Sequence, residues 1–144
     1  MKILKAESVS MFHKSLRVIY ALAAVLLVLG LFIGGAQPMV VGLFPEPWDK
    51  VVHATVFGAL AVLLALALRG AHVLHGRAAL GLGQSLVLAT LLATMVGGAD
   101  ELHQIWLPDR VAAWDGWFAD VAGVALALTG LRWLWWRREY CQAE

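Results

Sequence analysis

The sequence predicts an all-α membrane protein: a four-helix transmembrane bundle made by one domain over residues 1–144. Hydrophobic residues make up 61% of the chain and charged residues only 15%, and the mean hydropathy of +0.77 is too high for a soluble domain. A helix needs about 20 apolar residues to cross the hydrocarbon core of a bilayer. Stretches of about this length occur at residues 18–36, 51–68, 79–98 and 117–136.

The distribution of Lys and Arg predicts that both termini are cytoplasmic. With four spans, nine of the eleven basic residues lie on the side of the termini, and only Lys50 and Arg110 lie on the other. Because cytoplasmic loops carry an excess of Lys and Arg, we expect a multi-pass protein of the cytoplasmic (inner) membrane. Tryptophans flank the spans at both interfaces, as their amphipathic rings prefer.

The first span also has features of a secretory signal. A basic start and an apolar stretch precede Gly34-Gly35-Ala36, which resembles a small-residue cleavage site. The apolar stretch is longer than the roughly 7 to 15 residues usual for such signals. We therefore expect the span to be retained, with cleavage as the alternative.

Polar residues gather at the predicted outer face. Seven of the ten acidic residues lie at or near it, several of them inside the predicted helices. A charge at the centre of a spanning helix costs about 2.5 to 3.5 kcal/mol on insertion scales, so such residues usually face the bundle interior or a wet cavity. The candidate ligand-binding residues are Asp49, Lys50, His53, Glu101, Gln104, Arg110, Asp115 and Asp120.

Three of these candidates share one face at the start of the second span. Asp49 and Lys50 precede His53 by four and three residues, a helical spacing that suits proton handling or headgroup binding. The alternative is that Asp49 only interacts with the helix dipole while Lys50 extends to the interface. His53 lies about a turn inside the apolar stretch, where an imidazole either packs with a hydrogen bond or acts in function.

Acidic groups also crowd the end of the third span, where Glu101 and Gln104 share a face. Carboxylates are unfavourable at a helix C-terminus, so a cation is expected nearby unless the helix continues beyond them. Arg110 is the expected partner, because a guanidinium can hold a carboxylate or a phosphate with two hydrogen bonds. A structural pair with Glu101 and a ligand-binding role for Arg110 both stay open.

The fourth span carries two further acidic candidates. Asp115 either caps this helix or joins the cluster, whereas Asp120 lies deeper and needs a partner such as His53 or Arg110. Gly123 and Ala127 follow at four-residue spacing and predict close packing of another helix.

The polar motifs follow a fixed order: Asp49-Lys50-x-x-His53, Glu101-x-x-Gln104, Pro108-Asp109-Arg110, Asp115 and Gly123. In order and spacing they resemble the VanZ-like membrane protein family, over about residues 48–130. Asp109 replaces the usual Gly, Phe57 stands where Tyr is common, and Asp120 stands where many relatives have Asn. The charge at Asp120 argues against any role that needs a neutral amide.

The resemblance implies a place in the cell envelope rather than a defined activity. The family is named for an accessory protein that gives low-level resistance to the glycopeptide antibiotic teicoplanin. Because teicoplanin carries an acyl chain, a protein that binds it, or alters the lipid-linked precursor it targets, would act at the outer leaflet. The polar cluster of this chain is predicted there.

Three functions fit these residues. The first is a protein that binds an anionic lipid headgroup, a lipid-linked envelope precursor or a lipoglycopeptide. The second is a membrane enzyme acting on a lipid-linked substrate, with His53 or Glu101 as acid or base and Arg110 stabilising developing charge. No Ser or Cys among the outer residues offers an activated nucleophile for it. The third is a structural accessory subunit of a membrane complex.

Other chemistry is not predicted. His53 and His103 could join carboxylates around a metal ion, but their spacing matches no metal signature, so neither a metal site nor a cofactor is predicted. Cys141 is the only cysteine, and the scattered basic residues do not predict nucleic-acid binding. The expected partner is a membrane lipid or lipid-linked precursor, with a membrane protein or a second copy of the chain as a further partner.

Overall fold

The computed structural model describes residues 2–40, 42–71, 79–108 and 114–141, with side chains described from Met11 onward except at 139 and 140. Within these residues every regular element is helical, which confirms the all-α class. The elements are α1 (Lys2–Gly35), the 3₁₀ helix η1 (Pro38–Val40), α2 (Trp48–Leu68), α3 (Leu82–Gln104) and α4 (Trp114–Cys141). Four helical stretches are long and apolar enough to cross a membrane: Met11–Gly35, Trp48–Leu68, Leu82–Gln104 and Trp114–Arg138.

The helices extend beyond the predicted spans at their polar ends. The second helix begins at Trp48 rather than at 51, and the third continues to Gln104 rather than ending at 98. Hydropathy locates the apolar middle of a span, whereas backbone hydrogen bonding continues into the interface where polar residues are tolerated. The motif residues at these ends therefore lie on rigid helical turns.

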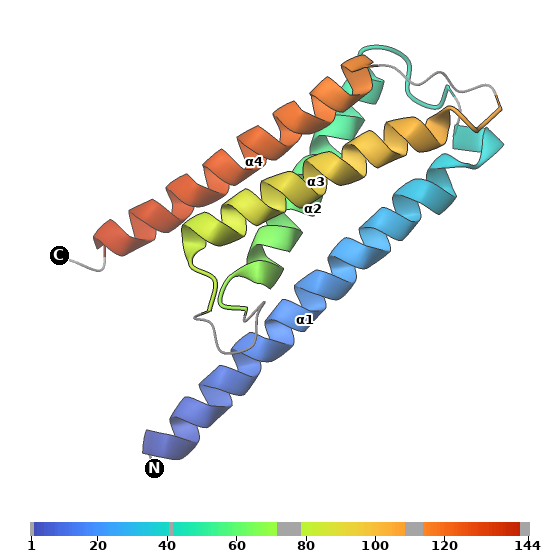
Figure 1. The fold of residues 1–144 in the computed structure, drawn as a ribbon. Coiled ribbons are helices and arrows are strands. Elements are labelled where there is room, and N and C mark those ends of the chain that lie inside the picture. The colour runs from blue at the N-terminus through green and yellow to red at the C-terminus, as the bar shows by residue number, and fades with distance from the viewer. Residues whose placement is uncertain (1, 41, 72–78, 109–113, 142–144) are drawn as a thin grey trace.

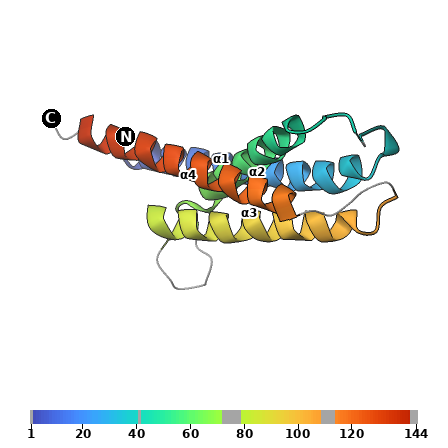
Figure 2. The same cartoon turned by 90° about the horizontal axis from the view of Figure 1, so that it is seen from above.

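The helices alternate in direction, so the start of α1 and the end of α4 lie at one end of the molecule (Figures 1 and 2). The end of α1, the start of α2, the end of α3 and the start of α4 lie at the other end, which we call the connection end. If all four helices span the membrane, both ends of the chain lie on the same side of it. That this side is cytoplasmic stays a prediction from the Lys and Arg distribution.

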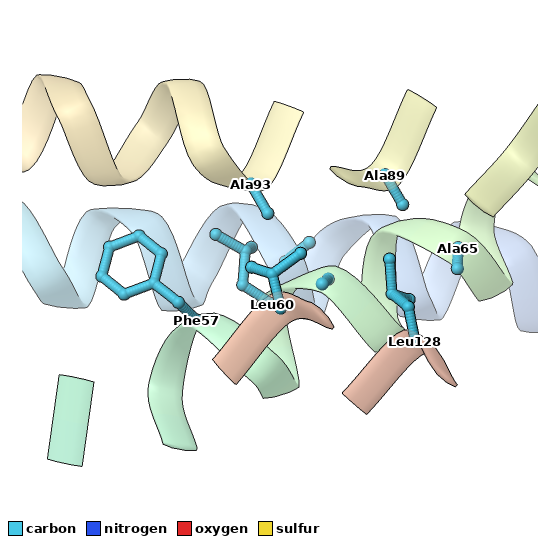
Figure 3. Packing of buried hydrophobic residues seen from close by; sticks show 9 residues of the cluster. Phe57, Leu60, Ala65, Ala89, Ala93 and Leu128 are labelled. Atoms are coloured by element: carbon cyan, nitrogen blue, oxygen red, sulfur yellow. The ribbon is translucent and has the colours of Figure 1, made fainter. Parts of the chain in front are cut away.

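The core lies between α2, α3 and α4, and α2 packs against all three other helices. Figure 3 shows Phe57 and Leu60 of α2 directed into the core, which also contains Ala93 of α3 and Leu128 of α4. Each of these three helices buries a stripe with four-residue spacing, the period that keeps side chains on one helical face. The stripes are Phe57, Ala61 and Ala65 on α2, Ser85, Ala89, Ala93 and Gly97 on α3, and Gly116, Asp120, Val124 and Leu128 on α4.

Glycines bring the backbones of α2 and α4 into contact. A Cβ added at Gly123 would collide with the backbone of Ala54, and one at Gly58 would lie 3.0 Å from the Gly123 carbonyl oxygen and 3.3 Å from Cβ of Ala127. Small residues allow such close approach, which membrane helices use in place of hydrophobic association. The predicted packing role of Gly123 and Ala127 is confirmed.

We predict that Gly123→Ala destabilises the bundle. The added methyl group meets backbone rather than a movable side chain, so we expect a loss of about 1–3 kcal/mol in the free energy of unfolding, measured by denaturant titration in mild detergent. Gly130→Ala on the same helix is the control, because a Cβ there has no heavy atom within 4 Å. Equal stability of the two variants would contradict the close packing.

Candidate functional site

A polar cavity of about 640 Å³ opens at the connection end, between the ends of all four helices. Six of the eight predicted ligand residues line it: Asp49, Lys50, His53, Glu101, Gln104 and Asp115. Asp120 is buried and is not among the lining residues. Arg110 lies outside the described residues, so its pairing with Glu101 and its role in binding stay predictions.

A lysine links the first turns of α2 and α4 at the rim of the cavity. Lys50 Nζ lies 2.8 Å from Asp49 Oδ2 and 3.1 Å from Asp115 Oδ2. Asp115 Oδ1 also accepts a hydrogen bond from the Gly116 amide at 3.0 Å. Asp115 therefore joins the cluster and does not act on its own helix alone. Water screens these partly exposed ion pairs, so this network positions charges more than it stabilises the fold.

A buried histidine–carboxylate pair lies deeper between the same two helices. His53 Nδ1 is 3.0 Å from Asp120 Oδ1, and the Asp120 side chain is completely buried. A buried carboxylate requires a charged or hydrogen-bonding partner, because its desolvation is otherwise very costly. Of the two partners expected for Asp120, the described structure provides His53.

Glu101 reaches the same place from α3. Glu101 lies four residues after Gly97, the last residue of the buried α3 stripe, and therefore shares its helical face. In the same way, His53 lies four residues before Phe57, the first residue of the buried α2 stripe. The ligand atoms of His53, Glu101 and Asp120 all lie within 4.8 Å of one another. We call these three residues the inner cluster. Three helices thus direct one polar group each toward the bundle interior, at the floor of the cavity.

Two glycines make room for the carboxylates of the inner cluster. A Cβ at Gly97 would lie 2.9 Å from Asp120 Oδ2, and a Cβ at Gly116 would collide with the carboxylate of Glu101. Any larger residue at either position would displace a carboxylate. Neither glycine was predicted as a site residue, although each lies four residues before a candidate carboxylate, Gly97 before Glu101 and Gly116 before Asp120.

Other polar residues of the α3 end are engaged outside the inner cluster. Gln104 Nε2 donates a hydrogen bond to Asp100 Oδ2 at 3.0 Å, and Asp100 is buried. His103 packs its ring against Phe32 of α1, with ring centroids 5.1 Å apart. Asp100, which the sequence analysis did not place among the ligand residues, therefore holds the Gln104 amide at the cavity wall.

The described lining of the cavity is acidic. Its only lysine is Lys50, which is already ion-paired, and the carboxylates outnumber it: Glu46, Asp49, Asp100, Glu101 and Asp115. Such a lining attracts cations and hydrogen-bond donors. Binding of an anion requires additional positive charge, from Arg110 or from a bound cation.

Apolar grooves adjoin the cavity on both sides of α4. A groove of about 1010 Å³ between α2 and α4 shares Lys50 with the cavity. A second groove, of about 710 Å³ between α3 and the start of α4, shares Glu101 with it. The polar cavity and the apolar grooves therefore meet at these two residues.

Comparison with known proteins agrees with the motifs. A family model described as VanZ/LLP1 matches residues 4–136. The chain belongs to this family. The match confirms the resemblance drawn from the polar motifs and extends it over α1, which carries none of them. Neither the curated proteins nor the solved structures contain a match to this VanZ-family chain.

We predict energetic coupling between His53 and Asp120. Residues in direct contact usually show coupling energies of about 0.5–3 kcal/mol, whereas distant pairs are additive. In a double-mutant cycle on the free energy of unfolding in detergent, His53→Ala and Asp120→Asn should couple within this range. The control cycle combines His103→Ala with Asp120→Asn and should be additive. Additivity in both cycles would show that the buried pair does not form.

Proposed function

We propose that this VanZ-family protein binds a membrane lipid or a lipid-linked cell-envelope precursor. The polar headgroup would enter the cavity at the connection end, and the hydrocarbon chain would lie in an adjoining apolar groove. The observation that carries the proposal is the position of Glu101, whose side chain lines both the polar cavity and the α3–α4 groove. A ligand that is polar at one end and apolar at the other matches this arrangement.

The α3–α4 groove supports the apolar half of the proposal. Apart from Thr94 and Glu101 its lining is apolar, aromatic or glycine: Met95, Gly98, Ala99, Leu102, Ile105, Trp114 and Trp117. Trp117 Nε1 donates a hydrogen bond to the Thr94 carbonyl at 3.2 Å, which fixes one wall. Burial of a chain contributes about 0.8 kcal/mol per CH₂ group, and a bilayer already supplies that environment. The groove would therefore orient the chain, while the cavity would select the headgroup.

Whether the cavity accepts an anionic headgroup depends on Arg110. Lys50 is shared between two carboxylates, so an anionic headgroup would need the guanidinium of Arg110 for a bidentate contact. If the predicted orientation holds, the cavity faces the outer leaflet, where envelope precursors are used. Tolerance of glycopeptide antibiotics, suggested by the family name, would then follow from sequestering such a lipid or an acylated antibiotic.

We predict that the purified protein retains a defined lipid that Arg110→Ala loses. Native mass spectrometry in mild detergent should show at least tenfold less of this lipid on Arg110→Ala than on wild type, because a charge-assisted contact is removed. Arg132→Ala, at the opposite end of α4, is the matched control and should retain it. If all three proteins carry the same mixture of lipids, the binding proposal fails, and a structural role within a membrane complex becomes the better account.

A second candidate function is catalysis on the same class of lipid, favoured by the His53–Asp120 contact. A carboxylate that holds one ring nitrogen fixes the orientation and tautomer of an imidazole, as a general acid or base requires. Glu101 lies close enough to act on the same substrate atom. The nucleophile would have to be water or a carboxylate, because the described cavity lining includes no Ser, Thr or Cys side chain.

Catalysis predicts turnover of a radiolabelled lipid-linked precursor in proteoliposomes. General acid–base catalysis contributes about 10²–10⁴-fold, so His53→Ala should lose at least about 100-fold in rate. His103→Ala is the control, since its ring packs against Phe32 instead. Retention of the lipid by wild type without any turnover would leave binding as the function and exclude this candidate for that lipid.

A further inference from the structure

The inner cluster brings together three side chains of types that bind metal ions. We propose that His53, Glu101 and Asp120 bind one divalent cation of the Zn²⁺ or Mn²⁺ class. The site is a property of the protein alone and does not depend on the lipid proposed above. It also differs from the metal ligands weighed in the sequence, because His103 packs against α1 and takes no part.

The ligands come from three facing helices. Each of these ligands lies on the buried stripe of its own helix or extends that stripe by one turn, so all three polar groups point to one place in the bundle interior. Metal sites of helical bundles are built in this way, from inward side chains of adjacent helices. Because the positions are 53, 101 and 120, no local sequence signature could have indicated them.

The distances allow a shared ion, which would hold the three ligand atoms within about 4.2 Å of one another, twice a metal–ligand distance of about 2.1 Å. The three ligand atoms lie within 4.8 Å of one another, and His53 Nδ1 is 3.0 Å from Asp120 Oδ1. Two ligands at about 2.1 Å from an ion lie about 3.0 Å apart at the right angles of octahedral geometry and about 3.4 Å apart at tetrahedral angles. The observed separation therefore suits two neighbouring ligands of an octahedral ion, and a tetrahedral ion would move them slightly apart. An ion would bind the imidazole nitrogen in its deprotonated form.

A buried oxygen gives independent support. Asp120 is completely buried, and its Oδ2 has no hydrogen-bond partner within the described part of the chain. Buried polar atoms are nearly always satisfied, so this oxygen needs an explanation such as an unseen ion or water. It lies against α3 at Gly97, one helical turn from Glu101, where only a glycine leaves space for it.

Charge and ligand type identify the class of ion. Two carboxylates and a neutral imidazole balance a divalent cation, whose own charge dominates such a site. Imidazole suits Zn²⁺ better than Mg²⁺ or Ca²⁺, while the two carboxylates also suit Mn²⁺. His53 and Glu101 line the cavity, so the open coordination positions would face it. There the ion would supply the positive charge that an acidic lining lacks, and would bind a water or an anionic oxygen.

Metal titration of the full-length protein in detergent tests the proposal without any lipid. After chelator treatment and removal of the chelator, isothermal titration with Zn²⁺ and, separately, Mn²⁺ should show one ion per chain for at least one metal, with a Kd of about 10 µM or tighter. Glu101→Gln and Asp120→Asn should each weaken binding at least tenfold, and His53→Ala should do the same. Co²⁺ in the same site should give a visible absorption spectrum that changes in His53→Ala, because a nitrogen ligand is lost.

Glu46→Gln is the matched control, since it removes an exposed carboxylate of the cavity lining that belongs to no part of the inner cluster. It should bind the ion within about twofold of wild type. Binding that Glu46→Gln weakens as much as Glu101→Gln would show a diffuse acidic surface and overturn the proposal, as would the absence of stoichiometric binding by wild type. If Asp120→Asn fails to fold, Glu101→Gln and the Co²⁺ spectrum still decide the question.

Discussion

The close approach of α2 and α4 at Ala54 and Gly123 is the constraint on which the candidate site depends. Ala54 directly follows His53, and Gly123 lies about one helical turn after Asp120. The contact that brings the two backbones together therefore also brings the imidazole within 3.0 Å of the carboxylate. A side chain at position 123 would separate both pairs at once. Core packing and the buried polar pair are for this reason one structural feature.

From this contact the polar groups become steadily more exposed toward the mouth of the cavity. The exposed fraction of the side chain is 0% for Asp120, 22% for His53, 28% for Lys50 and 58% for Asp115. Interactions weaken in the same direction, because water screens the outer ion pairs but not the inner pair. The outer ion pairs are therefore weaker than the inner pair, which water does not reach at Asp120. Glycines at 97 and 116 leave space for the two carboxylates of the inner cluster.

Much of this arrangement follows from the sequence. Apolar length gave the four helices, and four-residue spacing indicated that Gly123 packs closely and that Asp120 needs a buried partner. The choice between His53 and Arg110 as that partner could not be made, because it depends on how far one helix is shifted along another. That shift is set by packing between residues distant in the chain. The inward direction of Glu101 and the space provided by Gly97 and Gly116 depend on the same shift. Hydropathy also placed the end of the third helix too early, at residue 98 instead of Gln104, because helical turns in the membrane interface are polar.

The most direct test of the account is the ¹⁵N NMR spectrum of the protein with labelled histidine in detergent micelles. The chain has five histidines, so the ring resonances of His53 are assignable by their loss in His53→Ala. The account predicts that Asp120→Asn shifts these resonances strongly, because the partner of Nδ1 changes, and that Asp49→Asn, which leaves that partner in place, shifts them little. Unchanged His53 resonances in Asp120→Asn would contradict the buried pair, and with it the site built around it.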